Sequence, residues 1–167
     1  MRRFVEVVDA ISEWTALPLS MFILLMMLIL LVEVVLRYLF HAPTIWSHET
    51  CQHLFAGYAI LGGAYVLLYR GHVRMDVLYL QFSPRGQAIL DVLTYLLFFL
   101  FIVVMLVYGV EDAVWSWSIK EVSKTPFHPP MYPLRTALPV GAFLILLQGL
   151  AHFIRALHMA IRGRELE

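Results

Sequence analysis

The sequence predicts an all-α membrane protein with four transmembrane helices. The 167 residues are 61% hydrophobic and only 14% charged, and the mean hydropathy is +0.79. A soluble domain of this length could not bury so much apolar surface. The hydrophobic residues also form four long runs, each near the length of roughly 20 residues that crosses a bilayer as a helix.

A short amphipathic segment, residues 1–14, comes before the first of these runs. Its apolar residues recur at helical spacing among charged neighbours: Phe4, Val7, Val8 and Ile11. This pattern is typical of a helix that lies at the membrane interface. Three acidic residues interrupt the segment, so it does not resemble a cleaved signal peptide.

The predicted spans lie at about residues 17–40, 50–69, 89–115 and 138–159. The fourth begins near Pro139, and no soluble domain is left over, so we treat residues 1–167 as one integral membrane domain. The third pattern stays helical from Gly86 to Ile119. At 1.5 Å per residue such a helix is about 50 Å long, more than a hydrocarbon core of about 30 Å. We therefore expect it to tilt or to project beyond the membrane.

The distribution of Lys and Arg predicts that both termini are cytoplasmic. The basic residues on that side are Arg2, Arg3, Arg70, Arg74, Arg85, Arg162 and Arg164. On the other side, the connection HAPTIWSHE has no Lys or Arg, and the third connection has Lys120, Lys124 and Arg135. The bias places the loop Arg70–Asp76 in the cytoplasm.

Two charged residues lie near the end of the first span. Glu33 and Arg37 are four residues apart, so they share a helix face and are expected to pair. One interpretation is a pair that reaches the headgroup level. The alternative is a charge within the membrane that meets a partner helix.

The motif Trp46-x-x-Glu49 opens the second helix. Thr44 or Ser47 is expected to cap this helix, and the Glu49 carboxylate suits the positive N-terminal end of the helix dipole.

The sequence predicts neither a cofactor nor an enzymatic site. A bis-histidine haem needs two histidines at matching depth on neighbouring helices, whereas His53 and His152 fall toward opposite sides of the membrane. The single cysteine, Cys51, excludes an internal disulfide and a multi-cysteine metal cluster. Four helices without an internal repeat or deeply buried charges make a poor transporter alone. This favours an accessory subunit.

The loop RGHVRMD contains four candidate residues after the second span. Arg70 and Arg74 are interpreted as cytoplasmic retention charges that also contact lipid phosphates. His72 and Asp76 are four apart and would pair in a helical turn. Contact with a substrate is the alternative.

Together, in this order and topology, the motifs resemble the small membrane subunit (DctQ type) of tripartite ATP-independent periplasmic (TRAP) transporters. The resemblance covers nearly the whole chain. It rests on Glu33-x-x-x-Arg37-Tyr38, Trp46-x-x-Glu49, Gly71-His72-Val73-Arg74-Met75-Asp76, and Pro129-Pro130-Met131-Tyr132-Pro133 before Pro139-Val140-Gly141.

The resemblance implies a non-enzymatic scaffold in the bacterial inner membrane, bound beside a large multi-span subunit and in contact with lipids. The large subunit would hold the sodium and substrate sites, and a periplasmic binding protein would deliver an organic acid. Candidate contacts with the large subunit are Glu33, Arg37, Trp46 and Glu49. Candidate contacts with the binding protein are Lys120, Lys124 and Arg135.

Three alternatives remain open from the residues. The first is the membrane anchor of a redox complex, and the second is the small subunit of a tripartite tricarboxylate transporter. The third is an autonomous four-helix carrier or channel.

Overall fold

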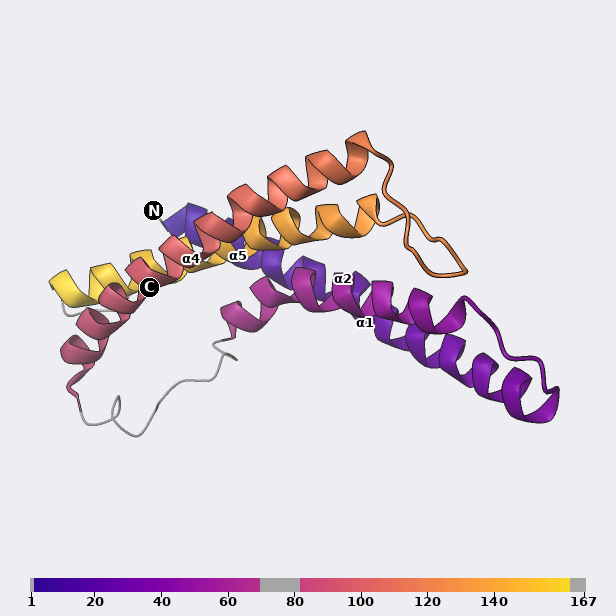
Figure 1. The fold of residues 1–167 in the computed structure, drawn as a ribbon. Helices are drawn as coiled ribbons and strands as arrows, with labels where there is room; N and C mark the ends of the chain where they lie inside the picture. Colours follow the sequence, from indigo (N-terminus) through magenta and orange to yellow (C-terminus); the bar gives the residue numbers. More distant parts are fainter. Residues whose placement is uncertain (1, 70–81, 163–167) are drawn as a thin grey trace.

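The structure, a computed structural model, describes residues 2–69 and 82–162. These ranges contain four long helices, α1 (Arg2–Leu39), α2 (Ser47–Leu68), α4 (Pro84–Ser118) and α5 (Tyr132–Arg162) (Figure 1). All four are long and apolar enough to cross a membrane, which confirms the predicted fold class. Within the described ranges there is no β-strand, and Val122 and Pro130 form one isolated bridge.

The helices form two antiparallel pairs that diverge toward one end (Figure 1). One pair is α1 with α2 and the other is α4 with α5, and α5 also packs on α2 and α1. The pairs separate toward the end that holds the connections 40–46 and 119–131. We refer to this end as the connection end. The opposite end, where α1 begins and α5 finishes, is the terminal end.

Helix α5 is the central helix because it packs against all three others. A third of its most hydrophobic stretch is buried in the protein, against 6% for α4. Two glycines allow the close approach. A Cβ at Gly141 would lie 2.7 Å from the Ile60 carbonyl oxygen of α2, and one at Gly149 would lie 2.4 Å from the Phe98 ring of α4. Side chains at these positions would push the helices apart.

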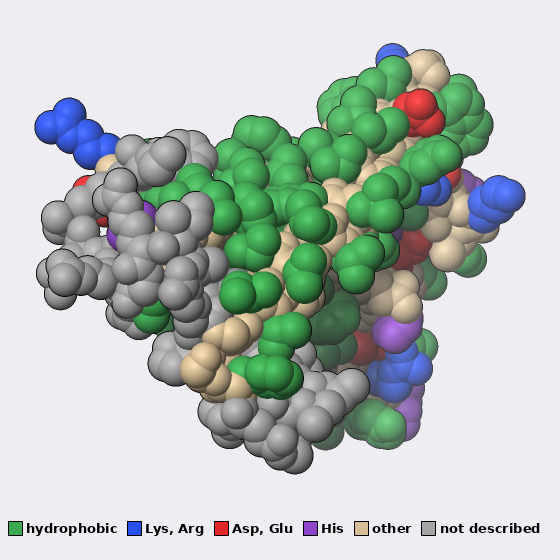
Figure 2. Space-filling model, turned by 90° about the vertical axis from the view of Figure 1, so that its left-hand side faces the viewer, with side chains coloured by type: hydrophobic (Ala, Val, Ile, Leu, Met, Phe, Trp, Pro, Cys, Tyr) green, Lys and Arg blue, Asp and Glu red, His purple; other side chains and the backbone are tan. Residues whose placement is uncertain are grey.

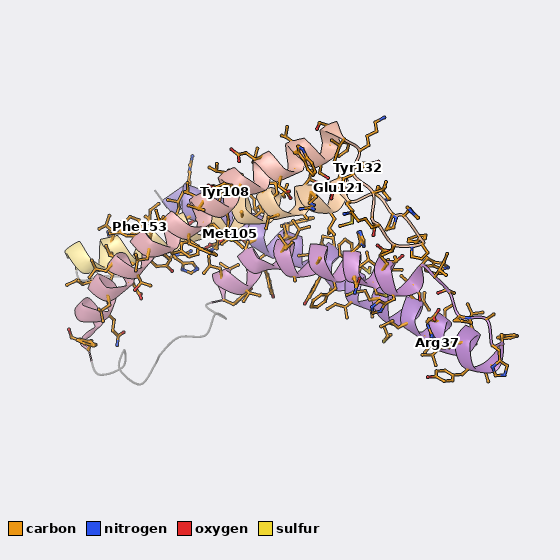
Figure 3. All side chains as sticks on the ribbon, in the orientation of Figure 1. Arg37, Met105, Tyr108, Glu121, Tyr132 and Phe153 are labelled. Atoms are coloured by element: carbon orange, nitrogen blue, oxygen red, sulfur yellow. The ribbon has the colours of Figure 1, made fainter. Side chains whose placement is uncertain are left out.

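Aromatic rings fill the contact between α4 and α5. Near the terminal end, rings with centroids 5.5–6.3 Å apart form one cluster: Tyr95, Phe98, Phe99 and Phe153. At the connection end, Trp117 packs on Tyr132 with ring centroids 4.4 Å apart. Figure 3 shows Phe153 and Tyr132 toward opposite ends of α5. The α4–α5 pair is therefore held together near both ends.

The first helix differs from the prediction for residues 1–14. These residues do not form a separate helix, because α1 continues without a break from Arg2 through Pro18 to Leu39. Val5 and Val8 pack against Ala151 of α5, whereas Val7 and Ile11 are exposed. The apolar residues thus form two faces, one buried on α5 and one open. A pattern of spacing within one segment could not show that α5 covers one of them.

The other helix bounds agree with the prediction in part. Helix α4 spans 35 residues, about 50 Å at 1.5 Å per residue, which confirms the long third helix. Its N-cap is Ser83, whose hydroxyl accepts a hydrogen bond from the Gly86 N–H at 3.3 Å. Helix α5 begins at Tyr132, before the predicted start near Pro139, and Pro139 lies inside it.

Large apolar side chains dominate the outward surfaces of α1 and α4. Figure 2 shows one face of the molecule, where hydrophobic side chains cover most of the described surface and charged groups lie toward the margins. On α4, Leu97 is 70% exposed and Leu100 is 67% exposed. Such surfaces are compatible with lipid acyl chains.

Candidate subunit contacts and the polar links between helices

The Glu33 carboxylate links α1 to the connection that follows it. Glu33 as a whole is only 7% exposed. It pairs with the Arg37 guanidinium, which confirms the predicted pair, and it accepts hydrogen bonds from the Thr44 hydroxyl and from the Thr44 N–H at 3.1 Å. The predicted capping of α2 is wrong, because the N-cap is Trp46 and no side chain caps the helix. The hydroxyl of Thr44 instead binds the charged carboxylate, a stronger acceptor.

Glu49 links the two helix pairs at the connection end. It lies in the first turn of α2, as expected for the helix dipole, and is 9% exposed. Its carboxylate accepts a hydrogen bond from the Thr125 hydroxyl in the connection 119–131. Beside it, the His53 ring nitrogen Nε2 lies 3.2 Å from the Met131 sulfur. Helix α2 thereby holds the connection between α4 and α5.

Arg135 joins three parts of the chain. From α5, its guanidinium binds the Asp112 carboxylate of α4 at 2.6 Å and the Glu121 carboxylate of the connection at 3.1 Å. The buried Ser116 hydroxyl donates to the other oxygen of Glu121 at 2.8 Å. Figure 3 shows Glu121 near the junction of the connection with α4 and α5. The charge of Arg135 is thus engaged inside the chain, where it shapes the connection.

Lys120 and Lys124 have exposed side chains in the same connection. Lys120 has a φ of 48°, in the left-handed region. This conformation ends α4, with the Lys120 N–H bonded to the Trp117 carbonyl and the Glu121 N–H bonded to the Ser116 carbonyl. The backbone at this point is therefore fixed, while the ammonium groups remain accessible.

A buried polar cluster joins α1 to α5 toward the terminal end. The Ser12 hydroxyl donates to the Gln148 side-chain oxygen at 2.8 Å, and the Gln148 amide donates to the Asp9 carboxylate at 2.9 Å. Arg155 binds the second oxygen of Asp9. Gln148 is fully buried and Ser12 is 2% exposed. The cluster fixes the first part of α1 on α5.

This cluster was not among the sequence-predicted sites. A signal was present in the spacing, because Asp9 and Ser12 are three residues apart and Gln148 and Arg155 are seven apart. Each pair therefore lies on one face of its helix. The spacing does not show that the two faces meet.

The histidines considered for a cofactor make contacts within the protein. The His152 ring nitrogen Nε2 lies 3.0 Å from the Leu67 carbonyl oxygen, and His53 contacts Met131. Among the residues that the structure describes, no three His, Cys, Asp or Glu side chains are grouped so that they could hold a metal ion.

The remaining predicted residues fall into two groups. Arg37 and Trp46 keep exposed surface, with 51% of the Arg37 side chain and 37% of Trp46 accessible, and Figure 3 shows Arg37 near the far end of the α1–α2 pair. The loop residues lie outside the described residues, so their roles stay predictions: Arg70, His72, Arg74 and Asp76.

A groove lies between α1 and α2 that the sequence did not reveal. Its volume is about 350 Å³, and its lining includes Ser20, Ile23, Tyr58, Ala59, Gly62 and Tyr65. The lining thus combines small residues with three hydroxyl groups.

Comparison with known protein families gives one match. Residues 26–159 match the family described as tripartite ATP-independent periplasmic transporters, DctQ component. The match covers most of the chain, and the chain therefore belongs to the DctQ family, which is a transporter component and not an enzyme. No curated protein matches the chain.

Proposed function

We propose that this DctQ-family chain is the small, fixed membrane subunit of a bacterial inner-membrane transporter that imports organic acids with a sodium gradient. A large membrane subunit holds the sodium and substrate sites, and a periplasmic binding protein delivers the acid. The family match over residues 26–159 carries the proposal. Because the family is independent of ATP, an ion gradient is the natural source of energy for uptake.

The links at both ends of the protein support a scaffold role. Glu49 holds the connection 119–131 at one end, and Gln148 holds α1 on α5 toward the other. Each link joins residues that are far apart in the sequence, so the helices resist sliding past each other. A large subunit that moves its substrate site across the membrane needs a rigid scaffold that stays fixed in the bilayer.

The use of polar groups supports placing the substrate site in the large subunit. The buried polar side chains of α5 are engaged inside this chain, since Gln148 binds Ser12 and Asp9 and His152 contacts Leu67. Groups engaged in this way are not available to bind a substrate.

The connection 119–131 is proposed to face the periplasm, with both termini in the cytoplasm. Lys120 and Lys124 then lie exposed on the side from which the binding protein approaches. We assign them to contact with that protein, and Arg135 to holding the connection in the required shape.

The test is uptake by proteoliposomes that contain both membrane subunits. Reversing both charges, Lys120→Glu with Lys124→Glu, should lower uptake several-fold when the binding protein is limiting, because charges at the rim of an interface mainly set association rates. Saturating binding protein should restore uptake, and high salt should weaken the wild type. Lys120→Arg with Lys124→Arg, which keeps both charges at the same exposed positions, is the matched control and should leave uptake unchanged.

Two results would contradict the proposal at different levels. Unchanged uptake at limiting binding protein would remove the assigned contact. Purification of the tagged chain without a large membrane subunit would remove the scaffold role itself.

A further inference from the structure

Helix α2 and its C-cap residue expose side chains along one narrow line. The exposed residues are His48, Gln52, Phe55, Ala59, Val66 and Tyr69, and every other residue from Ser47 to Leu68 is buried or half-buried. With the half-buried Gly62 included, the steps along the chain alternate between four and three residues. We refer to these seven residues as the α2 seam.

The spacing of the seam suits a neighbouring helix. A repeat of 3.5 residues keeps the same face turned toward a partner helix over the whole length of the contact. The 22 residues of α2 extend over about 33 Å, close to the hydrocarbon thickness of about 30 Å. The seam could therefore contact one transmembrane helix along its full length.

The middle of the seam is open to a close approach. A Cβ at Gly62 would meet only the Leu19 side chain at 3.8 Å, an ordinary contact, whereas one at Gly63 would lie 2.7 Å from Ile145. Packing inside the described chain therefore explains Gly63 but not Gly62. Together with Ala59, Gly62 borders the groove of about 350 Å³ between α2 and α1. Small residues at such positions let the backbone of another helix approach.

Polar groups distinguish this surface from one that faces lipid. His48 and Gln52 are exposed in the first turns of α2, with their side chains 3.2 Å apart, and Tyr58 and Tyr65 line the groove. The outward face of α4 is different, because its exposed residues are mainly large and apolar: Leu93, Leu96, Leu97, Leu100, Phe101 and Val104.

The available area is near that of a specific interface. Packed helices lie 8–10 Å apart, so the open face of α1 and α2 is about 20 Å wide and about 33 Å long. The product is about 650 Å². One seated helix covers about half of this face, and a neighbouring helix of the same multi-span partner would cover the rest, so that together they approach the roughly 800 Å² per partner of a stable complex.

We propose that the α2 seam and the adjoining groove seat one transmembrane helix of the large membrane subunit. Ala59 and Gly62 lie at the closest approach, and His48 and Gln52 face a hydrogen-bonding side chain of that helix. The identity of the partner rests on the proposed function, whereas the geometry of the seam does not.

Photo-crosslinking in the assembled complex tests the inference. Benzoylphenylalanine is placed at Phe55 or Val66 of the seam, and at Leu97 or Val104 of α4 as matched controls. The full chain carries a tag and is co-expressed with the large subunit. We expect adducts with the large subunit from the two seam positions and none from the two α4 positions.

A substitution provides a second, quantitative measurement. Gly62→Leu fills the seam, and a Cβ there clashes with nothing in its own chain. It should lower the large subunit retained in a pull-down by at least about fivefold, the lower end of the effect of overpacking, while the full chain keeps its thermal stability. Val104→Leu on α4 should retain the large subunit.

The outcomes separate the two proposals. If the large subunit co-purifies but crosslinks only from α4, or if the seam crosslinks only to lipid or to a second copy of this chain, the inference is overturned and the proposed function stands. If the unsubstituted chain retains no large subunit, both are overturned.

Discussion

The buried hydrogen bonds of Gln148 should make a measurable contribution to the stability of the full chain. Ser12→Ala removes the 2.8 Å bond to Gln148, which costs about 0.6–1 kcal/mol in a membrane protein. Gln148→Leu removes that bond and also the 2.9 Å bond to the Asp9 carboxylate. A bond to a charged acceptor adds about 1.5–3 kcal/mol. Gln148→Leu should therefore cost about 2–4 kcal/mol in the free energy of unfolding.

The double variant tests whether the bond itself causes these effects. Once Gln148 is Leu, the Ser12 hydroxyl has lost this acceptor, so removing it should cost little more. The two single effects should then exceed the double effect by about 0.6–1 kcal/mol, the coupling energy of a direct contact. Ser12 and Gln148 are 136 residues apart in sequence, so local helix propensity cannot produce such a coupling.

Thermal unfolding of the purified chain in detergent is the assay. For a chain of this size about 1 kcal/mol corresponds to about 2–4 °C, so Gln148→Leu should lower the Tm by about 4–16 °C. The matched controls are Gln52→Leu and Ser118→Ala, whose side chains are exposed and bond within their own helices. Equal Tm values for Gln148→Leu and Gln52→Leu, or strictly additive effects, would refute the reasoning.

Three further substitutions probe the other links. Gly141→Ala should cost about 1–3 kcal/mol in the free energy of unfolding, because the new Cβ meets the Ile60 backbone. Its control, Gly62→Ala, meets no such barrier and should be neutral or stabilising by up to about 1 kcal/mol. Similar Tm values for the two variants would contradict the packing argument. Arg135→Met removes the partner of the Asp112 and Glu121 carboxylates, which are partly exposed. We expect the free energy of unfolding to fall by about 1–2 kcal/mol and proteolysis within residues 119–131 to become faster. An unchanged cleavage rate would show that Arg135 does not hold the connection. Glu49→Gln should lower the free energy of unfolding by about 1 kcal/mol, because an amide makes a weaker hydrogen bond to Thr125 of the connection. The control, Glu111→Gln, changes an exposed residue and should alter the free energy of unfolding by no more than about 0.5 kcal/mol. The measurement is the difference in Tm between the two variants.

The helices and their approximate lengths follow from local patterns in the sequence. Runs of apolar residues predict four spans, and the uninterrupted pattern after SPRG predicts the long α4. The Glu33–Arg37 pair is predictable for the same reason, since its spacing of four places both side chains on one helix face. In these cases the partners lie within one helix.

Contacts between helices could not be predicted in this way. Thr44 or Ser47 was expected to cap α2, yet neither does, and Thr44 binds Glu33, a residue 11 positions earlier whose charge makes it the stronger acceptor. Val8 was expected to share one apolar face with Val7 and Ile11, yet α5 covers Val8 while the other two stay exposed. Sequence spacing describes the face of one helix, but not which face of another helix lies opposite.

The central position of α5 has a consequence for how the protein is made. Chains are synthesised from the N-terminus, so α5 is the last of the four helices to leave the ribosome, although α1, α2 and α4 all pack against it. Until α5 is inserted, α4 lacks the helix on which its aromatic cluster rests. Premature termination after α4, between residues 119 and 131, should therefore leave three inserted helices, with α1 packed on α2 and α4 lacking its main partner. Quality-control proteases of the membrane would recognise such a product, and the cell would accumulate only full-length subunits.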